Sequence, residues 1–185
     1  MTTIVGISGS LRRGSFNTAL LRAAVELSPE GTTIVPRTLQ GIPLYDGDVE
    51  AAEGVPGAVA ALKEEIVAAD GLLLVTPEYN NGIPGVFKNT IDWLSRPPSD
   101  IGRVFGGRRV AVIGASPGQW GTALSQAAWL PVLRTLGTEP FWSGRVQLAR
   151  ARTVFDEEGR LVSDEARDRL RRFVEGFARF AAGPG

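Results

Sequence analysis

The stretch V-T-P-E-Y-N-N-G-I-P-G-V-F-K-N-T-I-D-W-L, from Val75 to Leu94, decides the fold class of this chain. The apolar run at 71–75 leads into it, and a short, uncharged, branched run is typical of a strand buried on both faces. Pro77, two asparagines and Pro84 then predict an irregular loop. Apolar residues recur at helical spacing from there to Leu94, which predicts a helix. A strand, a loop and a helix in this order are the repeating unit of a parallel α/β sheet.

The same alternation runs along the chain in both directions. Strands are expected at 3–8, 32–39, 71–75, 108–115 and 138–144, and helices at 18–27, 57–69, 86–94, 123–136 and 163–181. Residues 43–48 and 97–107 are expected to be loops, and 146–161 show no regular pattern apart from a turn at 156–159. Because crossovers between parallel strands are right-handed, the leading topology is a doubly wound sheet with helices on both faces, built as one domain over residues 1–185.

Composition narrows the possible functions. Lys plus Arg and Asp plus Glu number 20 each, so no net charge draws the chain toward nucleic acid or an anionic membrane. No apolar stretch is long enough to span a bilayer, and the first residues lack the pattern of a signal peptide, so we expect a cytoplasmic protein. The chain contains no cysteine and no histidine, which excludes thiol catalysis, disulfides, Cys/His metal sites and Ser-His-Asp triads. A bound cofactor is the simplest source of chemistry for such an enzyme.

The first candidate site is the loop at 9–17, which follows the first strand and opens the first helix. Free backbone N–H groups and the positive end of the helix dipole meet there, so a phosphate would be well placed. The loop matches neither G-x-x-x-x-G-K-[ST] nor G-x-G-x-x-G, which disfavours a nucleoside-triphosphate loop and a dinucleotide fingerprint. The alternative is an ordinary turn in which Ser15 or Asn17 only caps the helix. Hydrogen-bond donors and charge are available from Ser10, Arg12, Arg13, Ser15, Asn17 and Thr18.

Two further loops follow the third and fourth strands. In the loop at 77–84 the alternative to a ligand wall is a structural connection, with Tyr79 covering the edge of the core. In the loop at 116–122, Gly118 and Gly121 would allow close approach of the backbone to a flat ligand, and the alternative is again a turn. All three loops follow carboxyl ends of parallel strands, so we expect them to share the sheet edge where such folds bind ligands.

At these positions the chain resembles a known family. The motifs G-S-L-R-x-G-S-F-N at 9–17, P-E-Y-N-x-x-I-P-G-x-x-K-N-x-I-D-W-L at 77–94 and A-S-x-G-x-x-G at 115–121 are similar to those of the NAD(P)H-dependent FMN reductases. This flavodoxin-like group includes bacterial chromate and quinone reductases. The resemblance covers residues 3–145 and implies a flavodoxin-like, five-stranded parallel sheet in the order 2-1-3-4-5, with FMN at the switch point.

The resemblance also implies a role for individual residues. The FMN phosphate would be held by Ser10, Arg12, Ser15 and Asn17. The isoalloxazine would be lined, largely by backbone, by Pro77, Glu78, Tyr79 and Asn80, and bordered on its other side by Ser116 and Gly118. The third loop departs from the family in Pro117 and in Gly121-Thr122, where relatives often have two glycines.

No side chain is expected to be catalytic and no metal is expected, since the implied chemistry takes place on FMN N5. For Glu78 a capping or loop-orienting role is favoured over that of a general base. Backbone donors near flavin N1 and O2 would stabilise the reduced ring.

The implied activity is a ping-pong oxidoreduction. NAD(P)H would reduce the bound FMN and leave, and a quinone, free flavin, azo compound or metal oxyanion such as chromate would then take the electrons at the same face. The choice between NADPH and NADH stays open. The resemblance further implies a homodimer or homotetramer, to whose interface the helix at 88–94 with Trp93, and Trp129, could contribute, although each tryptophan is expected in the core.

Two other functions compete with this one. The first is a non-catalytic electron carrier of the flavodoxin type, but such carriers commonly have an acidic face and a Thr/Ser-rich phosphate loop. This chain is neutral and has Arg12 and Arg13 in that loop, which favours the reductase. The second is a nucleotide-binding regulatory domain without flavin.

Overall fold

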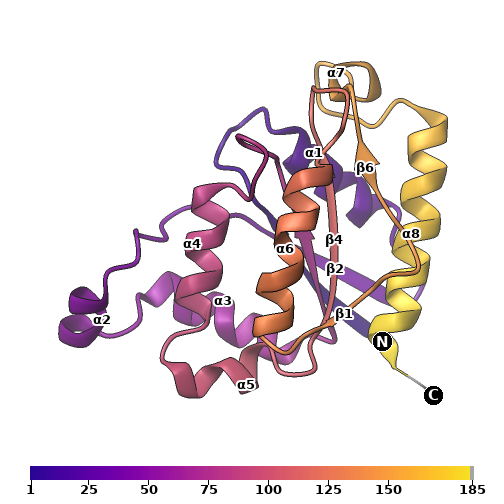
Figure 1. The fold of residues 1–185 in the computed structure, drawn as a ribbon. Coiled ribbons are helices and arrows are strands. Elements are labelled where there is room, and N and C mark those ends of the chain that lie inside the picture. The colour runs from indigo at the N-terminus through magenta and orange to yellow at the C-terminus, as the bar shows by residue number, and fades with distance from the viewer. Residues whose placement is uncertain (184–185) are drawn as a thin grey trace.

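A parallel β-sheet organises the computed structural model, which describes residues 1–183 (Figure 1). Five strands lie in the order β2-β1-β3-β4-β5, and a sixth strand, β6, also pairs with β4. This order confirms the predicted flavodoxin-like topology. The strands are β1 (Thr2–Ser8), β2 (Thr32–Arg37), β3 (Gly71–Val75), β4 (Arg109–Ala115), β5 (Glu139–Pro140) and β6 (Gln147–Leu148).

Helices cover both faces of the sheet, as predicted. Side chains of α1 and α8 pack in one apolar layer, and those of α3, α4 and α6 pack in the other (Figure 1). The α-helices are α1 (Phe16–Glu26), α2 (Gly47–Glu53), α3 (Gly57–Ala68), α4 (Gly85–Leu94), α5 (Ile101–Val104), α6 (Ala123–Thr135), α7 (Ala151–Val154) and α8 (Asp164–Ala182), and a 3₁₀ turn covers Pro98–Asp100.

The central strands are apolar without interruption because both of their faces are covered. In β1, Ile4 belongs to the layer of α1 and α8, and its neighbour Val5 belongs to the opposite layer. In β3, Leu73 and Leu74 divide in the same way, and every residue of that strand is buried. Alternating burial on two faces therefore accounts for the apolar runs that predicted these strands.

The segment after β2 differs from the sequence prediction. Residues 43–48 were expected to be a loop, but the helix α2 begins within them at Gly47. The Asp46 side chain caps this helix by accepting a hydrogen bond of 2.9 Å from the Asp48 N–H. No residue of α2 is buried, so the helix has no apolar stripe by which periodicity could reveal it. The expected loop at 97–107 likewise contains the 3₁₀ turn and α5.

The predicted fifth strand at 138–144 is also wrong in extent. Its ladder with β4 ends where the Phe141 N–H donates to the Val110 carbonyl (2.7 Å), and it resumes where the Gly114 N–H donates to the Val146 carbonyl (3.1 Å). Between these bonds the chain at 141–146 bulges away, since six residues there lie opposite the three at 111–113. The stretch that showed no pattern, 146–161, contains the short elements β6 and α7.

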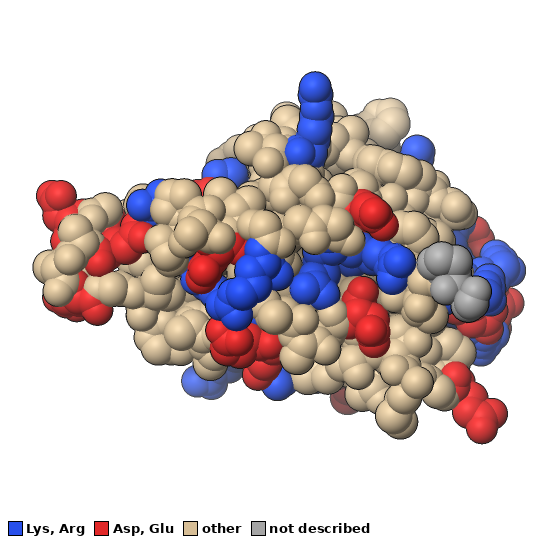
Figure 2. All heavy atoms as spheres, turned by 90° about the horizontal axis from the view of Figure 1, so that it is seen from below, with Lys and Arg blue, Asp and Glu red and all other residues tan. Residues whose placement is uncertain are grey.

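Charges of both signs lie intermixed on the face in Figure 2, where Lys and Arg are interspersed with Asp and Glu. The ion pairs of Lys63 with Asp100 (2.9 Å) and of Arg103 with Glu64 (2.9 Å) connect α3 to the 3₁₀ turn and to α5. Within residues 1–183, no helix is long and apolar enough to cross a bilayer. Nor do the described residues contain a cluster of three or more acidic side chains arranged to hold a metal ion.

The close approach of β4 to its neighbours gives the first prediction. A Cβ atom on Gly114 would lie 2.2 Å from the Thr76 carbonyl oxygen and 2.2 Å from Thr122 Oγ1. We expect Gly114→Ala to lower the free energy of unfolding by about 1–3 kcal/mol, since backbone must move to admit the methyl group. Urea unfolding measures this, with Gly57→Ala as the control, because a Cβ there meets nothing within 4 Å. Equal stability of the two variants would contradict the contact.

Candidate functional site

Three loops meet at the carboxyl edge of the sheet: loop one (9–15), loop two (76–84) and loop three (116–122), which follow β1, β3 and β4. Residues of all three line one cavity of about 50 Å³. The parallel register places the strand ends side by side, with Ser8 opposite Val75 and Val75 opposite Ile113. A cavity of this size fits a phosphate group and not a ring system.

Loop one brings buried hydroxyl groups to the start of α1. Ser15 caps the helix, and its Oγ accepts hydrogen bonds from the N–H groups of Asn17 (3.2 Å) and Thr18 (3.3 Å). Ser10 Oγ accepts from the Arg12 N–H at 3.3 Å. Ser10 and Ser15 are only 4% and 5% exposed although they line the cavity. The positive end of an eleven-residue helix and two buried hydroxyls thus face the same small space.

Arg12 supplies the charge at this cavity. Its guanidinium lies at the exposed side of loop one, where its one recorded hydrogen bond is a long one, 3.5 Å, to the Gly14 carbonyl. No carboxylate among residues 1–183 pairs with it. Arg13 is equally exposed but does not line the cavity. Arg12 is therefore the basic side chain available to an anion here.

Asn17, two residues after loop one, fastens the start of α1 to the end of β4. Its Nδ2 donates to the Ala115 carbonyl (2.8 Å), and its Oδ1 accepts from the Ala115 N–H (2.9 Å). The side chain is 3% exposed, so these bonds form away from water, where an unpaired partner is costly. One N–H of the amide remains for a ligand.

Loop two contains a tight turn. Tyr79 and Gly82 exchange backbone hydrogen bonds of 3.2 and 3.1 Å, and the two residues between them, Asn80 and Asn81, have φ angles of 49° and 62°. Positive φ at both central positions defines a type I′ turn, and asparagine tolerates this conformation better than most residues. The Tyr79 side chain, 47% exposed, stands at the rim of the cavity.

Glu78 joins loop two to the helix that follows loop three. Its Oε2 accepts hydrogen bonds from the N–H groups of Leu124 (2.8 Å) and Ser125 (3.0 Å) in the first turn of α6. Beside it, the hydroxyls of Thr76 and Ser125 share a hydrogen bond of 2.8 Å. The capping role favoured from the sequence is thus present, with a carboxylate placed where the helix dipole stabilises it.

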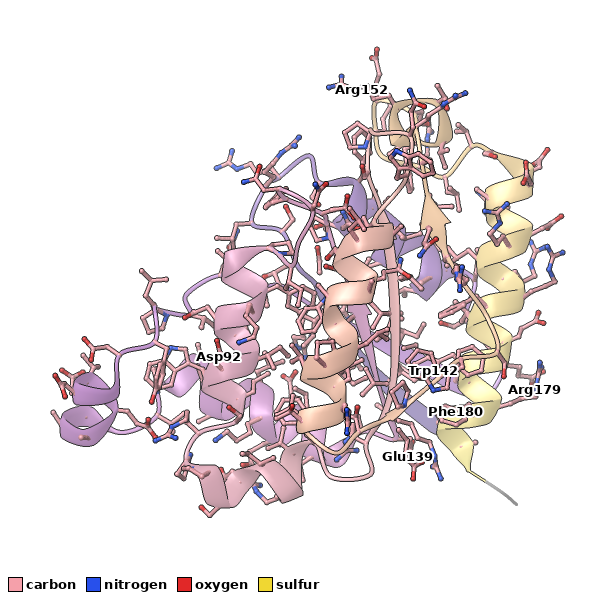
Figure 3. All side chains as sticks on the ribbon, in the orientation of Figure 1. Asp92, Glu139, Trp142, Arg152, Arg179 and Phe180 are labelled. Carbon is pink, nitrogen blue, oxygen red and sulfur yellow. The ribbon has the colours of Figure 1, made fainter. Side chains whose placement is uncertain are left out.

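Loop three is held by the segment after β5, which sequence reasoning did not connect with the site. The Ser116 N–H donates to the Leu148 carbonyl (2.9 Å), and the Ala151 N–H donates to the Ser116 carbonyl (3.0 Å). The Arg150 N–H donates to the Gly118 carbonyl (2.9 Å), with Arg150 itself at a left-handed φ of 49°. In Figure 3 this segment is at the top, where Arg152 is labelled. No motif marks these backbone contacts, so no sequence signal could have found them.

The structure brings most of the expected residues to one cavity. Its lining includes Ser10, Arg12, Ser15, Asn17, Pro77, Glu78, Tyr79 and Ser116. Asn80 and Gly118 lie in the same loops but outside that lining, and Phe16, Ala115 and Pro117 line it without having been singled out for it. The lining offers donors and a cation but no nucleophile with an adjacent base. It is suited to binding and positioning an anion.

The cap on α6 gives the second prediction. Glu78→Ala removes two hydrogen bonds from the helix N-terminus, and we expect the free energy of unfolding to fall by about 0.5–2 kcal/mol. Glu157→Ala is the matched control, because Glu157 is exposed and no hydrogen bond of its side chain is recorded within residues 1–183. Urea unfolding of both variants decides the matter. A loss no larger than that of the control would show that the cap is dispensable.

Comparison with known proteins agrees with this geometry. The family model of the NADPH-dependent FMN reductases matches residues 2–152. The chain is 45% identical over 172 residues to an NAD(P)H-dependent FMN reductase of Pseudomonas aeruginosa, PA1204, covering 93% of this chain and 91% of the relative. It is 37% identical over 175 residues to a 2-hydroxy-1,4-benzoquinone reductase of Burkholderia sp, covering 95% and 93%.

A solved structure of a flavoenzyme is also similar to this chain. The flavoenzyme NAD(P)H:(acceptor) oxidoreductase FerB of Paracoccus denitrificans superposes with a TM-score of 0.87 at 30% identity, covering 98% of each chain. Because the family model covers residues 2–152 and a relative is 45% identical over 93% of the chain, the chain belongs to the NADPH-dependent FMN reductase family.

Proposed function

We propose that this protein is an FMN-dependent oxidoreductase that takes hydride from NAD(P)H and passes the electrons to a small-molecule acceptor such as a quinone. The observation that carries the proposal is the meeting of three motif-bearing loops in one anion-sized cavity at the start of α1. Family membership supports it, as do relatives named FMN reductase and quinone reductase.

The cavity fits the phosphate of FMN. A phosphate monoester carries a charge of about −1.5 to −2 at neutral pH, and helix N-termini with free donors bind such groups. Ser10 and Ser15 would donate from their hydroxyls, Asn17 from its remaining N–H, and Arg12 from its guanidinium. The hydrogen bonds of the two serines support this assignment, because both buried hydroxyls only accept from backbone N–H groups, which leaves each O–H to donate to a ligand.

The other expected residues would border the flavin ring. Pro77, Glu78, Tyr79 and Asn80 belong to loop two, and Ser116 and Gly118 belong to loop three. When bound, FMN supplies the N5 atom that accepts hydride. The role of the chain is to hold FMN in position. Asn17 joins the start of α1 to the end of β4, and Glu78 joins loop two to the start of α6, so the loops that would border the flavin are held in fixed relative positions. Glu78 acts as the α6 cap and not as a general base.

The proposal extends to the order of the reaction and to the acceptors. We propose a ping-pong cycle in which the nicotinamide leaves before a quinone, free flavin, azo compound or metal oxyanion such as chromate enters at the same face. The lack of histidine and cysteine supports a site that selects acceptors by shape and redox potential instead of by a catalytic acid. Parallel lines in double-reciprocal plots at several acceptor concentrations are expected, and intersecting lines would contradict this order.

Two further parts of the proposal rest on the sequence, and a third, the oligomeric state, rests on the resemblance to the family. They are a single FMN-binding domain over residues 1–185, a cytoplasmic location, and assembly as a homodimer or homotetramer. Trp93 and Trp129 are both 0% exposed within the chain, so they belong to the core and are not available to an interface. Sedimentation velocity would measure the oligomeric state.

The first experiment is the visible spectrum of the purified protein with and without FMN, followed by anaerobic addition of NAD(P)H. A flavin spectrum that bleaches to the two-electron reduced form supports the reductase. Bound flavin that NAD(P)H does not reduce would favour a flavodoxin-type electron carrier. A protein that binds no flavin would favour a nucleotide-binding regulatory domain.

The phosphate assignment gives the third prediction. We expect Arg12→Ala and Asn17→Ala each to weaken FMN binding by about 1–3 kcal/mol, the range for hydrogen bonds to charged or buried groups. Quenching of flavin fluorescence during titration of the apo-protein measures the affinity. Arg13→Ala is the control, since Arg13 neighbours Arg12 but does not line the cavity. Unchanged affinity in both variants, or an equal loss in the control, would place the phosphate elsewhere.

A further inference from the structure

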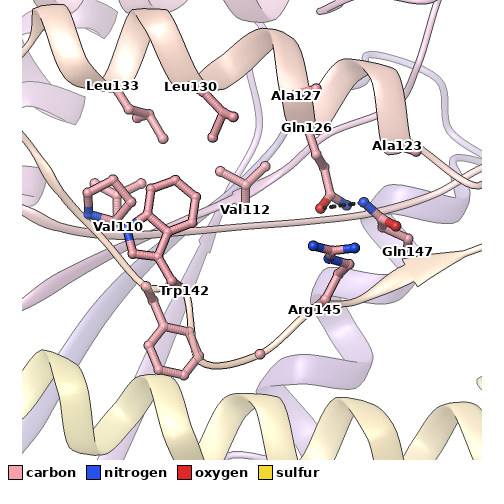
Figure 4. Close-up of a pocket in the computed structure, with 13 residues that line it drawn as sticks. Val110, Val112, Ala123, Gln126, Ala127, Leu130, Leu133, Trp142, Arg145 and Gln147 are labelled. Atoms are coloured by element: carbon pink, nitrogen blue, oxygen red, sulfur yellow. Dashed lines mark hydrogen bonds between the residues drawn. The ribbon is translucent and has the colours of Figure 1, made fainter.

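A second pocket lies at the edge of the sheet. It shares no lining residue with the cavity formed by the three loops. It has a volume of about 340 Å³ and lies between α6 and the chain at 141–147 (Figure 4). It exists because β4 has no strand partner on this side from 111 to 113, where the chain bulges away. Figure 3 shows Trp142, at the start of the bulge, between α6 and α8.

The floor of the pocket is an open piece of sheet edge. On this side of β4 the even-numbered residues make the hydrogen bonds, as shown by the Val110 carbonyl with Phe141 and the Gly114 N–H with Val146. Val112, between them, lines the pocket and has no paired strand residue on this side within the described chain. Its backbone N–H and carbonyl therefore face the pocket, and polar backbone of this kind normally has a partner.

One end of the pocket is apolar and partly open. Trp142 lies across from Leu130 and Leu133 of α6, as Figure 4 shows. Trp142 is 69% exposed and Leu130 is 45% exposed, so two large apolar side chains face water around the same pocket. Contiguous exposed apolar surface of this kind marks a binding site more often than an isolated exposed residue does.

The other end is polar and carries a positive charge. Gln147 Nε2 donates to Gln126 Oε1 at 3.3 Å, and Gln126 Nε2 donates to the Val146 carbonyl at 2.9 Å. The Arg145 guanidinium lies beside this pair (Figure 4). Within residues 1–183, no hydrogen bond or ion pair of the Arg145 side chain is recorded, and the lining contains no Asp or Glu.

The electrostatic surroundings add to this charge. On the other side of the same bulge, α8 presents Arg169, Arg172 and Arg179 to a groove that Arg145 also lines, and no carboxylate lines that groove. Of these three, Arg169 is paired with Glu165 at 2.7 Å. In a chain whose charges balance overall, this is a local excess of positive charge. Such an excess favours an anion over a neutral or cationic ligand.

We propose that this pocket binds a small amphipathic organic anion. The apolar body would lie between Trp142 and the α6 side chains, and a carboxylate or similar group would bind the Arg145 guanidinium next to Gln147. The volume lies at the lower end of the range for small-molecule sites, which fits a ligand with one or two rings or a short chain. A planar guanidinium binds a carboxylate through two parallel hydrogen bonds, which explains an arginine at the polar end.

The test is isothermal titration calorimetry on the full, FMN-loaded protein with naphthoate as the probe. Its neutral counterpart, naphthylmethanol, has the same rings without the charge. We expect naphthoate to bind about tenfold or more tightly than naphthylmethanol, the effect of a charge-assisted hydrogen bond. The heat of binding is read without turnover, so failure of this proposal does not depend on whether the protein reduces acceptors.

Two variants and a control assign the site. Arg145→Gln should weaken naphthoate binding about tenfold or more and leave naphthylmethanol unchanged, because only the charge is removed. Ala127→Phe should weaken both ligands by filling the pocket, and urea unfolding checks that this variant is folded. Arg134→Gln is the matched control: it lies on the same helix, is exposed, and lines none of the pockets described. Its affinity for naphthoate should equal that of the unmodified protein.

Several outcomes would overturn the proposal. Equal affinity for naphthoate and naphthylmethanol, an equal loss in Arg145→Gln and Arg134→Gln, or no saturable binding of naphthoate would each do so. So would an oligomer that Leu130→Glu dissociates in sedimentation velocity, since the apolar end of the pocket would then be an interface between copies of the chain.

Discussion

The buried hydrogen bonds between Asn17 and the backbone of Ala115 are the constraint on which the site depends. They join residues 98 positions apart and connect the start of α1 to the end of β4. Parallel pairing of β1, β3 and β4 brings three strand ends to one edge, but loops on an edge are free to separate. The Asn17 amide prevents this for loops one and three, and because it is shielded from water, no solvent molecule can easily replace either bond.

Glu78 holds loops two and three together, as Asn17 holds loops one and three together. Its carboxylate belongs to loop two, and the N–H groups that it accepts from belong to α6, the helix that follows loop three. The backbone of β6 and of the residues after it holds loop three from its other side. The polar groups at this edge thus fix the relative positions of the loops, while the two apolar layers stabilise the sheet beneath them. A site built in this way provides position and charge, which is what a protein without histidine or cysteine can offer a cofactor.

At the edge of the sheet beyond β4, fewer contacts determine the register of the chain. A central strand has neighbours on both sides and helices on both faces, so its register is determined by several contacts at once. The chain at 139–148 has one strand neighbour, β4, so fewer contacts hold its register. Glu139 and Phe141 donate to β4, which leaves the nitrogen of Pro140 on the free edge, where no N–H is required. The ladder breaks after Phe141 into β5 and β6, and the bulge between them leaves an exposed Trp142 and a pocket beside α6. After the bulge, β6 and the residues that follow it contact loop three, so one segment of the chain forms both the irregular edge and the support of the candidate site.

The sequence by itself determined the two-sided burial of β1, β3 and β4 and the loops that form the site, because each depends on local signals: uninterrupted apolar runs, helix periods and loop residues. The sheet order was implied by the resemblance to a known family, and the strand pairing in the structure confirms it. It also placed Ser15 and Glu78 in capping roles, since caps follow from position relative to a helix start. Only the tertiary structure decided the exposed helix α2, the division of the fifth strand, and the support of loop three by residues 147–151. The helix α2 buries no side chain, so it has no apolar period from which it could be predicted. The other two features depend on backbone hydrogen bonds between distant segments, which no side-chain pattern records.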